Sequence, residues 1–135
     1  MSSGVKLAGN CVATYEELKL KKTLRAIIYK IGDKSQEIEV EETLPASSSF
    51  ADVIAKLSDS ECRYVIVDFA YDHEGPKNKI CFVAWCPDTA NIKKKMLYTS
   101  SKDSLRKALN GVAVEIQGTD KSEVSNDSFL EKCKK

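Results

Sequence analysis

RYVIVDFAY (Arg63 to Tyr71) and ICFVAW (Ile80 to Trp85) are the two stretches that decide the fold class of this chain. Each is apolar on both of its alternating sets of positions, which predicts a strand covered on both faces. Such a sheet needs helices on its two sides, so the sequence predicts an α/β protein. Residues 72–78 between the strands are polar, contain a Gly-Pro pair, and are typical of a hairpin loop.

Three further strands are predicted around these two. LRAIIYKI (Leu24 to Ile31) is β-branched and aromatic, and after a turn that begins at Gly32 the residues 37–40 alternate acidic with apolar side chains. This alternation predicts a hairpin whose second strand shows one face to water. Residues 112–116 complete a set of five strands.

Four helices are predicted from capping residues and helical spacing. The first follows Asn10, and the second follows Ser49, with Asp52 in its first turn. The third is a basic helix that starts at Asp88 or Thr89, and the fourth covers residues 127–134. Within the third helix the hydroxyl side chains of 99–101 are expected to be a weak point, because hydroxyls can bond to preceding carbonyls and bend a helix axis.

The composition is that of a soluble globular protein. The chain has 135 residues, of which 42% are hydrophobic and 30% charged, and a domain of this size buries roughly two thirds of its unfolded surface. We expect a single domain over residues 1–135. The N-terminus lacks the features of a secretory signal, which predicts a cytoplasmic protein. Five cysteines without a CxxC pair favour reduced thiols.

Catalytic chemistry has few candidates here. His73, the single histidine, lies in the polar loop, where a surface role outweighs a catalytic or metal-binding one. The sequence has no glycine-rich phosphate motif and no Cys or His spacing that suits zinc. Asp68, an acid within an apolar strand, is expected to be hydrogen-bonded rather than catalytic. We therefore predict that the protein is not an enzyme, with no catalytic residues, no metal and no cofactor.

The charge is segregated in NIKKKMLYTSSKDSLRK (Asn91 to Lys107), which carries six cations and one acid although the net charge of the chain is only +1. A solvated helix face is the ordinary interpretation of such a run, and a contact surface is the functional one. An acidic protein, phosphoinositide headgroups or nucleic acid could bind it. The small net charge argues against nucleic acid, for which a basic domain is expected.

Helical geometry sorts the side chains of this segment. Lys95, Lys102 and Arg106 recur at helical spacing and lie near one stripe, whereas three consecutive lysines cannot all meet one partner. The core-facing side is expected to comprise four apolar residues, Ile92, Met96, Leu105 and Leu109. The flexible thioether of Met96 also suits an adaptable contact with a partner.

Several motifs resemble the actin-depolymerising factor/cofilin family over essentially the whole chain. They are Ser3-Gly-Val near the start, Cys62-Arg-Tyr-Val-Ile-Val-Asp-Phe, Trp85-Cys-Pro-Asp-Thr-Ala, Lys93-Lys-Lys-Met-Leu-Tyr-Thr-Ser-Ser-Lys-Asp-Ser-Leu, Gly118-Thr-Asp and Glu123-Val-Ser. The resemblance implies a gelsolin-like ADF-homology fold, with a central mixed five-stranded sheet flanked by helices on both faces. It also implies a monomeric protein that binds actin monomers and filaments, prefers the ADP state and promotes severing and depolymerisation.

The resemblance implies two actin-binding surfaces and one regulatory site. The monomer-side surface falls on Ser3, Gly4, Val5, Lys93, Lys95, Met96, Asp103, Arg106 and Lys107, and the filament-side surface on Lys77, Lys79, Glu131, Lys132 and Lys135. Ser3 resembles the family's phosphorylation site, where added negative charge would weaken binding. A cytoskeleton-associated location follows, whereas a basic nuclear-import insertion is not evident.

Some features depart from the family pattern. The 72–79 loop is short, and Asn91 stands where the family commonly has proline, which is expected to loosen the start of the basic helix. Rival functions are a coactosin-like or glia-maturation-factor-like protein without depolymerising activity, and a phosphoinositide-binding module that uses the same helix. A thiol-dependent enzyme ranks last, because no cysteine has an identifiable base.

Overall fold

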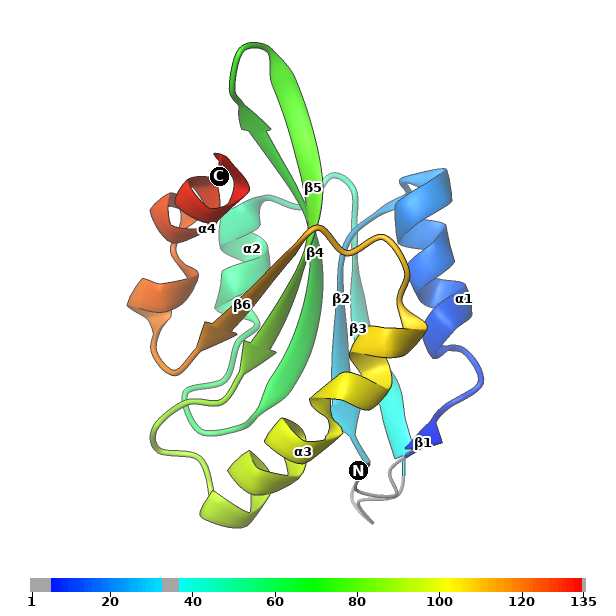
Figure 1. The fold of residues 1–135 in the computed structure, drawn as a ribbon, viewed down its shortest axis with the longest axis vertical. Coiled ribbons are helices and arrows are strands. Elements are labelled where there is room, and N and C mark those ends of the chain that lie inside the picture. Colours follow the sequence, from blue (N-terminus) through cyan, green and yellow to red (C-terminus); the bar gives the residue numbers. More distant parts are fainter. Residues whose placement is uncertain (1–5, 33–36, 135) are drawn as a thin grey trace.

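The computed structural model describes residues 6–32 and 37–134, which form one mixed sheet with helices on both faces (Figure 1). The strands are β1 (Lys6–Leu7), β2 (Leu24–Ile31), β3 (Glu37–Pro45), β4 (Arg63–Asp72), β5 (Pro76–Trp85) and β6 (Val114–Gly118). The helices are α1 (Cys11–Glu16) with its π-helical continuation η1 (Glu17–Lys21), α2 (Phe50–Ala55), α3 (Ile92–Ala108), the 3-10 helix η2 (Lys121–Val124) and α4 (Asn126–Lys134).

The sheet confirms the α/β prediction and adds one strand to it. Its order is β1-β3-β2-β4-β5-β6, with parallel pairing only at the two edges, β1 with β3 and β5 with β6. The prediction of five strands was wrong because β1 pairs through two residues alone, Lys6 with Glu37 and Leu7 with Ile38. A two-residue strand is too short to show the alternation by which strands are recognised in a sequence.

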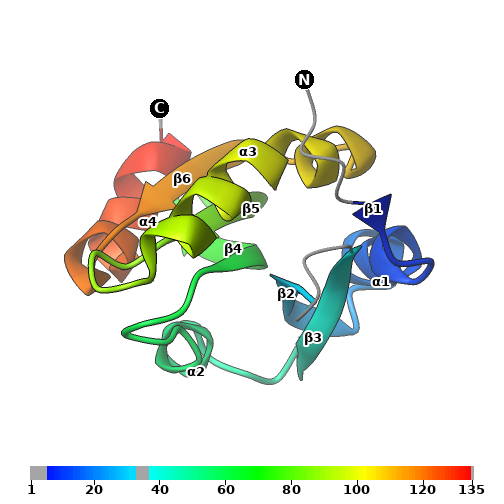
Figure 2. The same ribbon diagram turned by 90° about the horizontal axis from the view of Figure 1, so that it is seen from below.

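The helices divide between the two faces of the sheet (Figure 2). On one face α1 and α3 bury Tyr15, Tyr98 and Leu105, and on the other α2 and α4 bury Val53 and Phe129. This two-sided burial explains why β4 and β5 are apolar on both alternating sets of residues. It also fixes α3 rigidly enough to present its remaining side chains in a defined pattern.

The β4–β5 hairpin is longer than the sequence suggested. Its pairing runs without a break from Arg63 opposite Trp85 to Asp72 opposite Pro76, so only residues 73–75 form the turn. Gly75 has a φ of +116°, a conformation that favours glycine. The residues expected in a loop instead form a two-stranded ribbon that projects beyond the sheet (Figure 1). Their polarity follows from this projection, because no helix covers them.

Helix α4 is held against the base of this ribbon. Its Cys133 carbonyl accepts hydrogen bonds from Tyr71 Oη at 3.3 Å and from Lys79 Nζ at 2.8 Å. A lysine ammonium at the C-terminal end of a helix also interacts favourably with the helix dipole. On the core side the Phe129 ring packs edge-on against Phe50, with ring centroids 4.8 Å apart. The terminal helix and the ribbon therefore form one unit.

Candidate functional site

The start of α3 is capped by Asn91. Its side-chain oxygen accepts a hydrogen bond from the Lys93 backbone N–H at 2.8 Å. The expectation that helix α3 begins at Asp88 or Thr89 was therefore wrong by a few residues. Asparagine is one of the preferred N-cap residues, so it secures the helix start that the family's proline would otherwise define. The helix then runs without a break to Ala108, and within it Ser100 Oγ donates to the Leu97 carbonyl at 3.1 Å, the kind of bond expected of these hydroxyl residues.

The inner face of α3 is anchored to the sheet by two tyrosines. Tyr98 Oη accepts a hydrogen bond from the Ile31 backbone N–H at 2.8 Å, and Tyr64 Oη donates to the Tyr98 carbonyl. Burial raises the pKa of both phenols, so both remain neutral over the physiological range. Leu105 and Leu109 complete the buried face, as the sequence predicted.

The outer face of α3 presents a stripe of exposed side chains: Lys93, Met96, Asp103 and Lys107, which we call the outer stripe. Its members recur at intervals of three, seven and four residues, so they share one side of the helix. Met96 is 67% exposed, and the neighbouring Ile92 is 72% exposed. The prediction that these two residues face the core was wrong. They point away from the arc occupied by Tyr98 and Leu105, which is the arc that meets the sheet.

The cationic stripe expected to serve as a contact lies along the flank of α3 and is tied to the protein itself. Lys95 Nζ donates to the Asp88 carbonyl at 2.7 Å. Lys102 Nζ and Arg106 Nε lie 3.1 and 3.5 Å from the two carboxylate oxygens of Glu115 on β6. Glu115 therefore offsets part of the positive charge of the segment. Among residues 6–32 and 37–134, the outer stripe faces outward and makes no such side-chain contact, in contrast to these three cations.

The predicted filament-side residues meet at one corner of the molecule. Lys77 is exposed on the ribbon, and Glu131 and Lys132 are exposed on α4. Lys79, in contrast, donates to the carboxyl end of α4 and helps to hold the two elements together. This corner lies at the opposite end of the molecule from the start of α3 (Figure 1).

Part of the predicted site falls outside the residues that the structure describes: Ser3, Gly4, Val5 and Lys135. The strand that directly follows the first three, β1, lies beside α3 (Figure 2).

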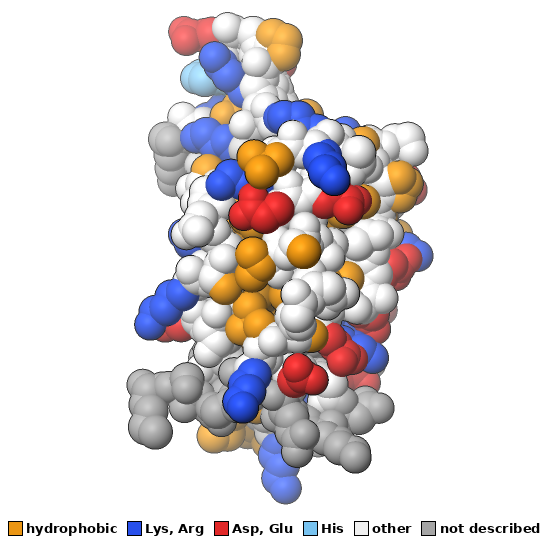
Figure 3. Space-filling model, turned by 90° about the vertical axis from the view of Figure 1, so that its right-hand side faces the viewer, with side chains coloured by type: hydrophobic (Ala, Val, Ile, Leu, Met, Phe, Trp, Pro, Cys, Tyr) orange, Lys and Arg blue, Asp and Glu red, His pale blue; other side chains and the backbone are white. Residues whose placement is uncertain are grey.

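A second face of the molecule has a mixed charge pattern. On the face that carries α1, acidic and basic side chains are interspersed around a small apolar strip (Figure 3). Leu20, on the η1 continuation of α1, is an apolar residue that is 69% exposed. Leu20 lies beside a lysine, as Met96 does, which supplies a matched comparison for experiments.

The described residues provide few groups for chemistry or membrane insertion. No cluster of three His, Cys, Asp or Glu side chains within 6–32 and 37–134 could hold a metal ion. Asp68 Oδ1 accepts a hydrogen bond from Asn78 Nδ2 at 2.9 Å, as the sequence predicted for this carboxylate. His73 is exposed at the hairpin turn. Over the same residues, no helix is long and apolar enough to cross a membrane.

Sequence reasoning missed Glu115 and the exposure of Ile92. Glu115 lies in a strand of mixed composition, and nothing in its neighbourhood marks it as the partner of two cations on α3. The outer stripe could have been found from the sequence, because the spacing of Lys93, Met96 and Lys107 places them on one side of any helix.

Comparison with known proteins identifies the family of this chain. A family model described as Cofilin/tropomyosin-type actin-binding protein matches residues 4–134. The chain therefore belongs to the cofilin/tropomyosin-type family of actin-binding proteins.

Several individual cofilins are similar to this chain over nearly its whole length. Cofilin-1A of Dictyostelium discoideum is 61% identical over 136 residues, covering 100% of this chain and 99% of the relative. Cofilin of Mycosarcoma maydis is 53% identical over 134 residues, covering 98% of this chain and 96% of that protein. The crystal structure of Streptomyces griseoflavus cofilin superposes with a TM-score of 0.90 at 47% identity, with 96% of each chain covered.

Proposed function

We propose that this chain is an actin-depolymerising protein that binds actin monomers through the outer stripe of α3. The observation that carries the proposal is Met96, an apolar side chain 67% exposed between cations on a helix whose other face is locked to the sheet. A rigidly presented apolar anchor within a charged rim is typical of an interface hot spot. The exposed lysines would steer the encounter with an acidic partner surface.

The monomer-side surface extends beyond this stripe. The proposal includes Lys95 and Arg106 on the flank of α3, and Ser3, Gly4 and Val5 ahead of β1. The proximity of β1 to α3 supports this extension, because β1 directly follows these three residues in the sequence. The cations on the flank would reach a partner at the cost of their contacts with Asp88 and Glu115.

The filament-side surface is proposed at the corner formed by the ribbon and α4. It comprises Lys77, Lys79, Glu131, Lys132 and Lys135. Two separated surfaces allow one molecule to contact two neighbouring subunits of a filament. The protein would then favour whichever filament twist it binds more tightly, and would promote severing and subunit loss through that preference. A preference for ADP-actin, a monomeric state and a cytoplasmic, cytoskeleton-associated location belong to the same proposal.

Charge reversal at this corner is expected to separate the two activities. Lys77→Glu combined with Lys132→Glu should weaken filament binding about tenfold, because reversing rim charges turns attraction into repulsion. Monomer affinity should change less than about twofold, because α3 lies elsewhere. Co-sedimentation with filaments and a fluorescence titration of monomers would measure the two affinities.

The matched control is the same double reversal at the end of η1, at Lys21 and the adjacent Lys22, which are both exposed. It should alter neither affinity. Equal loss of filament and monomer binding in the Lys77 and Lys132 variant would contradict a separate filament surface.

Ser3→Glu is expected to weaken monomer binding by about tenfold, because the added negative charge would be repelled by the acidic surface of the partner. Ser3→Ala is the neutral control and should bind as tightly as the unchanged protein. A titration of labelled monomeric actin would compare the three. Equal affinity for the Glu and Ala variants would remove the regulatory role of Ser3.

Phosphoinositide headgroups are a second candidate ligand. Lys93 and Lys107 are exposed cations on the same outer stripe, and such residues attract anionic headgroups. Binding to lipid and to actin would then be mutually exclusive. Vesicles containing phosphoinositide should displace monomeric actin from the protein, and simultaneous binding of both would contradict a shared surface.

A coactosin-like or glia-maturation-factor-like function is distinguished by sedimentation. A protein of either kind would leave the pool of unpolymerised actin unchanged. A depolymerising protein raises that pool as it acts on filaments.

A further inference from the structure

Two cysteines outside the proposed actin surfaces face each other at the end of the β4–β5 hairpin. Arg63 pairs with Trp85 in the last rung of this hairpin, so the next residues outward, Cys62 and Cys86, lie opposite one another. Both side chains pack into the core on the α3 side of the sheet. The two thiols are close enough to shift each other's pKa.

The backbone around the pair marks a non-hydrogen-bonded position of the hairpin. The Cys86 N–H donates to the Gly118 carbonyl on β6 at 2.9 Å, away from β4. The Cys62 carbonyl accepts from Arg63 Nη1 at 2.7 Å instead of from β5. Opposed residues at such positions have Cα atoms about 4.5 Å apart. This separation falls within the range of about 4.4–6.8 Å that disulfides span.

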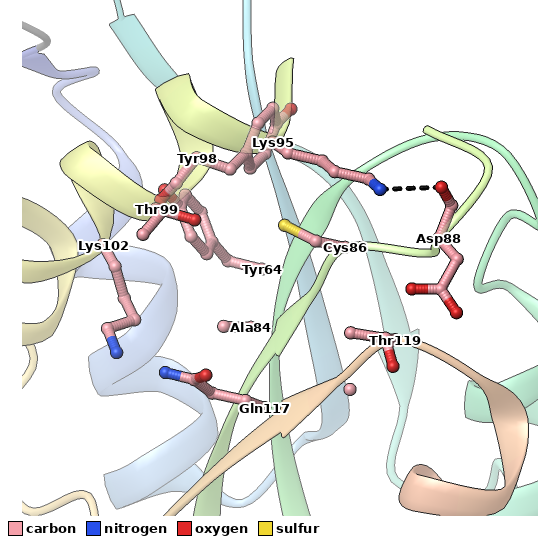
Figure 4. A pocket seen from close by; sticks show the side chains of 11 residues that line it. Tyr64, Ala84, Cys86, Asp88, Lys95, Tyr98, Thr99, Lys102, Gln117 and Thr119 are labelled. Carbon is pink, nitrogen blue, oxygen red and sulfur yellow. Dashed lines mark hydrogen bonds between the residues drawn. The ribbon is translucent and has the colours of Figure 1, made fainter. Parts of the chain in front are cut away.

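The two thiols differ in access. Cys86 is half-buried and lines a pocket of about 240 Å³ between α3 and the strands β5 and β6, into which its sulfur points (Figure 4). Cys62 is only 1% exposed. The neighbouring Cys62 thiol, together with the Lys95 ammonium above the pocket, lowers the pKa of Cys86. The more accessible thiol is therefore also the one with more thiolate character.

We propose that Cys86 is a peroxide-reactive thiol and that Cys62 resolves it by forming an intramolecular disulfide. The Cys86 thiolate attacks hydrogen peroxide, the O–O bond breaks, and Cys86 sulfenic acid and hydroxide form. The Cys62 thiol then attacks the sulfenic sulfur, the S–S bond forms, and the departing hydroxyl leaves as water with the Cys62 proton. The two thiols are oxidised by two electrons and the peroxide is reduced.

The other three cysteines lack this combination of access and partner. Cys81 and Cys133 place their sulfurs 3.7 Å apart, but both are buried, and burial raises the pKa of both thiols. Cys11 is fully buried, donates to the Ile38 carbonyl, and also has its pKa raised by burial. A buried thiol in apolar surroundings is a poor nucleophile. Oxidation should therefore begin at Cys86.

The new bond would preserve the fold. It joins residues that already oppose each other across a paired hairpin, so neither strand needs to move to a new register. The pocket also lies on the inner side of α3, whereas the outer stripe faces away from it. Oxidation would thus add a covalent bond between the two strands at the end of the hairpin, on the side of the sheet that α3 covers.

The test is a titration of the reduced full chain with hydrogen peroxide, followed by alkylation and mass spectrometry of a non-reduced digest. We expect one intramolecular link, between Cys62 and Cys86, at doses that leave the other three thiols open to alkylation after denaturation. In Cys62→Ala, Cys86 should accumulate as sulfenic acid that dimedone traps. In Cys86→Ala, Cys62 should stay reduced at the same doses. Cys133→Ala, which removes a thiol outside the pair, should oxidise like the unchanged chain.

Three results would each overturn the proposal. The first is a link between Cys81 and Cys133 that forms before any other. The second is oxidation of Cys86 without a bond to Cys62 in the unchanged chain. The third is a Cys62 that oxidises as readily in Cys86→Ala as in the unchanged protein. All three readouts are independent of actin binding, so failure of the proposed function would leave this test intact.

Discussion

Replacing both Lys93 and Met96 with Glu is expected to weaken the binding of monomeric actin by at least about 100-fold, as loss of an interface hot spot does. Met96 would lose its apolar contact, and its replacement would bring a carboxylate into the interface without a partner. Reversal at Lys93 would turn a steering attraction into repulsion. A fluorescence titration of labelled monomers would measure the change in affinity.

The control for this variant is Leu20→Glu combined with Lys21→Glu on η1. It replaces an exposed apolar residue and an exposed lysine in the same way, because Leu20 is 69% exposed and Met96 67% exposed. Both variants should unfold at nearly the same denaturant concentration as the unchanged protein, since surface substitutions rarely alter stability by more than about 0.5 kcal/mol. Equal affinity losses in the two variants would show that the outer stripe has no special role.

Phe129→Ala is expected to lower the free energy of unfolding by about 3–5 kcal/mol, the cost of removing a buried aromatic ring. The Phe129 side chain is fully buried, and its ring lies 4.8 Å from that of Phe50 and 5.3 Å from that of Phe69, centroid to centroid. This cluster holds α4 against the sheet. Urea unfolding followed by circular dichroism would measure the loss.

The same substitution should affect the two actin surfaces differently. Helix α4 carries Glu131 and Lys132 of the proposed filament side, whereas α3 lies on the opposite face of the sheet. Filament binding should therefore weaken before monomer binding does. Leu20→Ala is a control at an exposed position and should be nearly neutral. A loss below about 1 kcal/mol for Phe129→Ala would contradict the role of this ring in anchoring α4.

Much of the sheet could be predicted because its central strands carry an unambiguous pattern. Arg63 to Tyr71 is apolar on both sets of positions, and only a strand covered on both faces requires that. The polarity pattern gave the wrong prediction at the ribbon, whose residues were expected to form a loop. Residues 77 and 78 are polar because they extend past the helices, and in a sequence this is indistinguishable from a loop. The edge strand β1 escaped prediction because its parallel pairing involves only two residues.

The candidate site could be predicted in its location but not in its orientation. Helical spacing gives the angle between any two side chains of α3, yet it does not say which arc meets the sheet. Apolar residues occur on two arcs, one with Ile92 and Met96 and one with Tyr98 and Leu105. The arc with Tyr98 is the one that meets the sheet, because the Tyr98 hydroxyl accepts a hydrogen bond from the Ile31 backbone N–H. That contact spans two distant parts of the chain, and no local pattern encodes it.

The ion pairs between α3 and β6 could not be predicted from the sequence either. Glu115 lies between Lys102 and Arg106 only because β6 is brought alongside α3 by its parallel pairing with β5. The net positive charge of the basic segment therefore overstated the field that a partner would meet. Exposed ion pairs of this kind contribute at most about 1 kcal/mol each, so they shape the surface more than they stabilise the fold.

The most direct test of the account is site-specific photo-crosslinking to monomeric actin, with the photoreactive residue at Met96 in one variant and at Leu20 in another. Both positions are exposed, so the probe itself should be tolerated at each. We expect a covalent product with actin from position 96 and none above background from position 20. Efficient crosslinking from position 20 together with none from position 96 would contradict the claim that the outer stripe of α3 docks on actin.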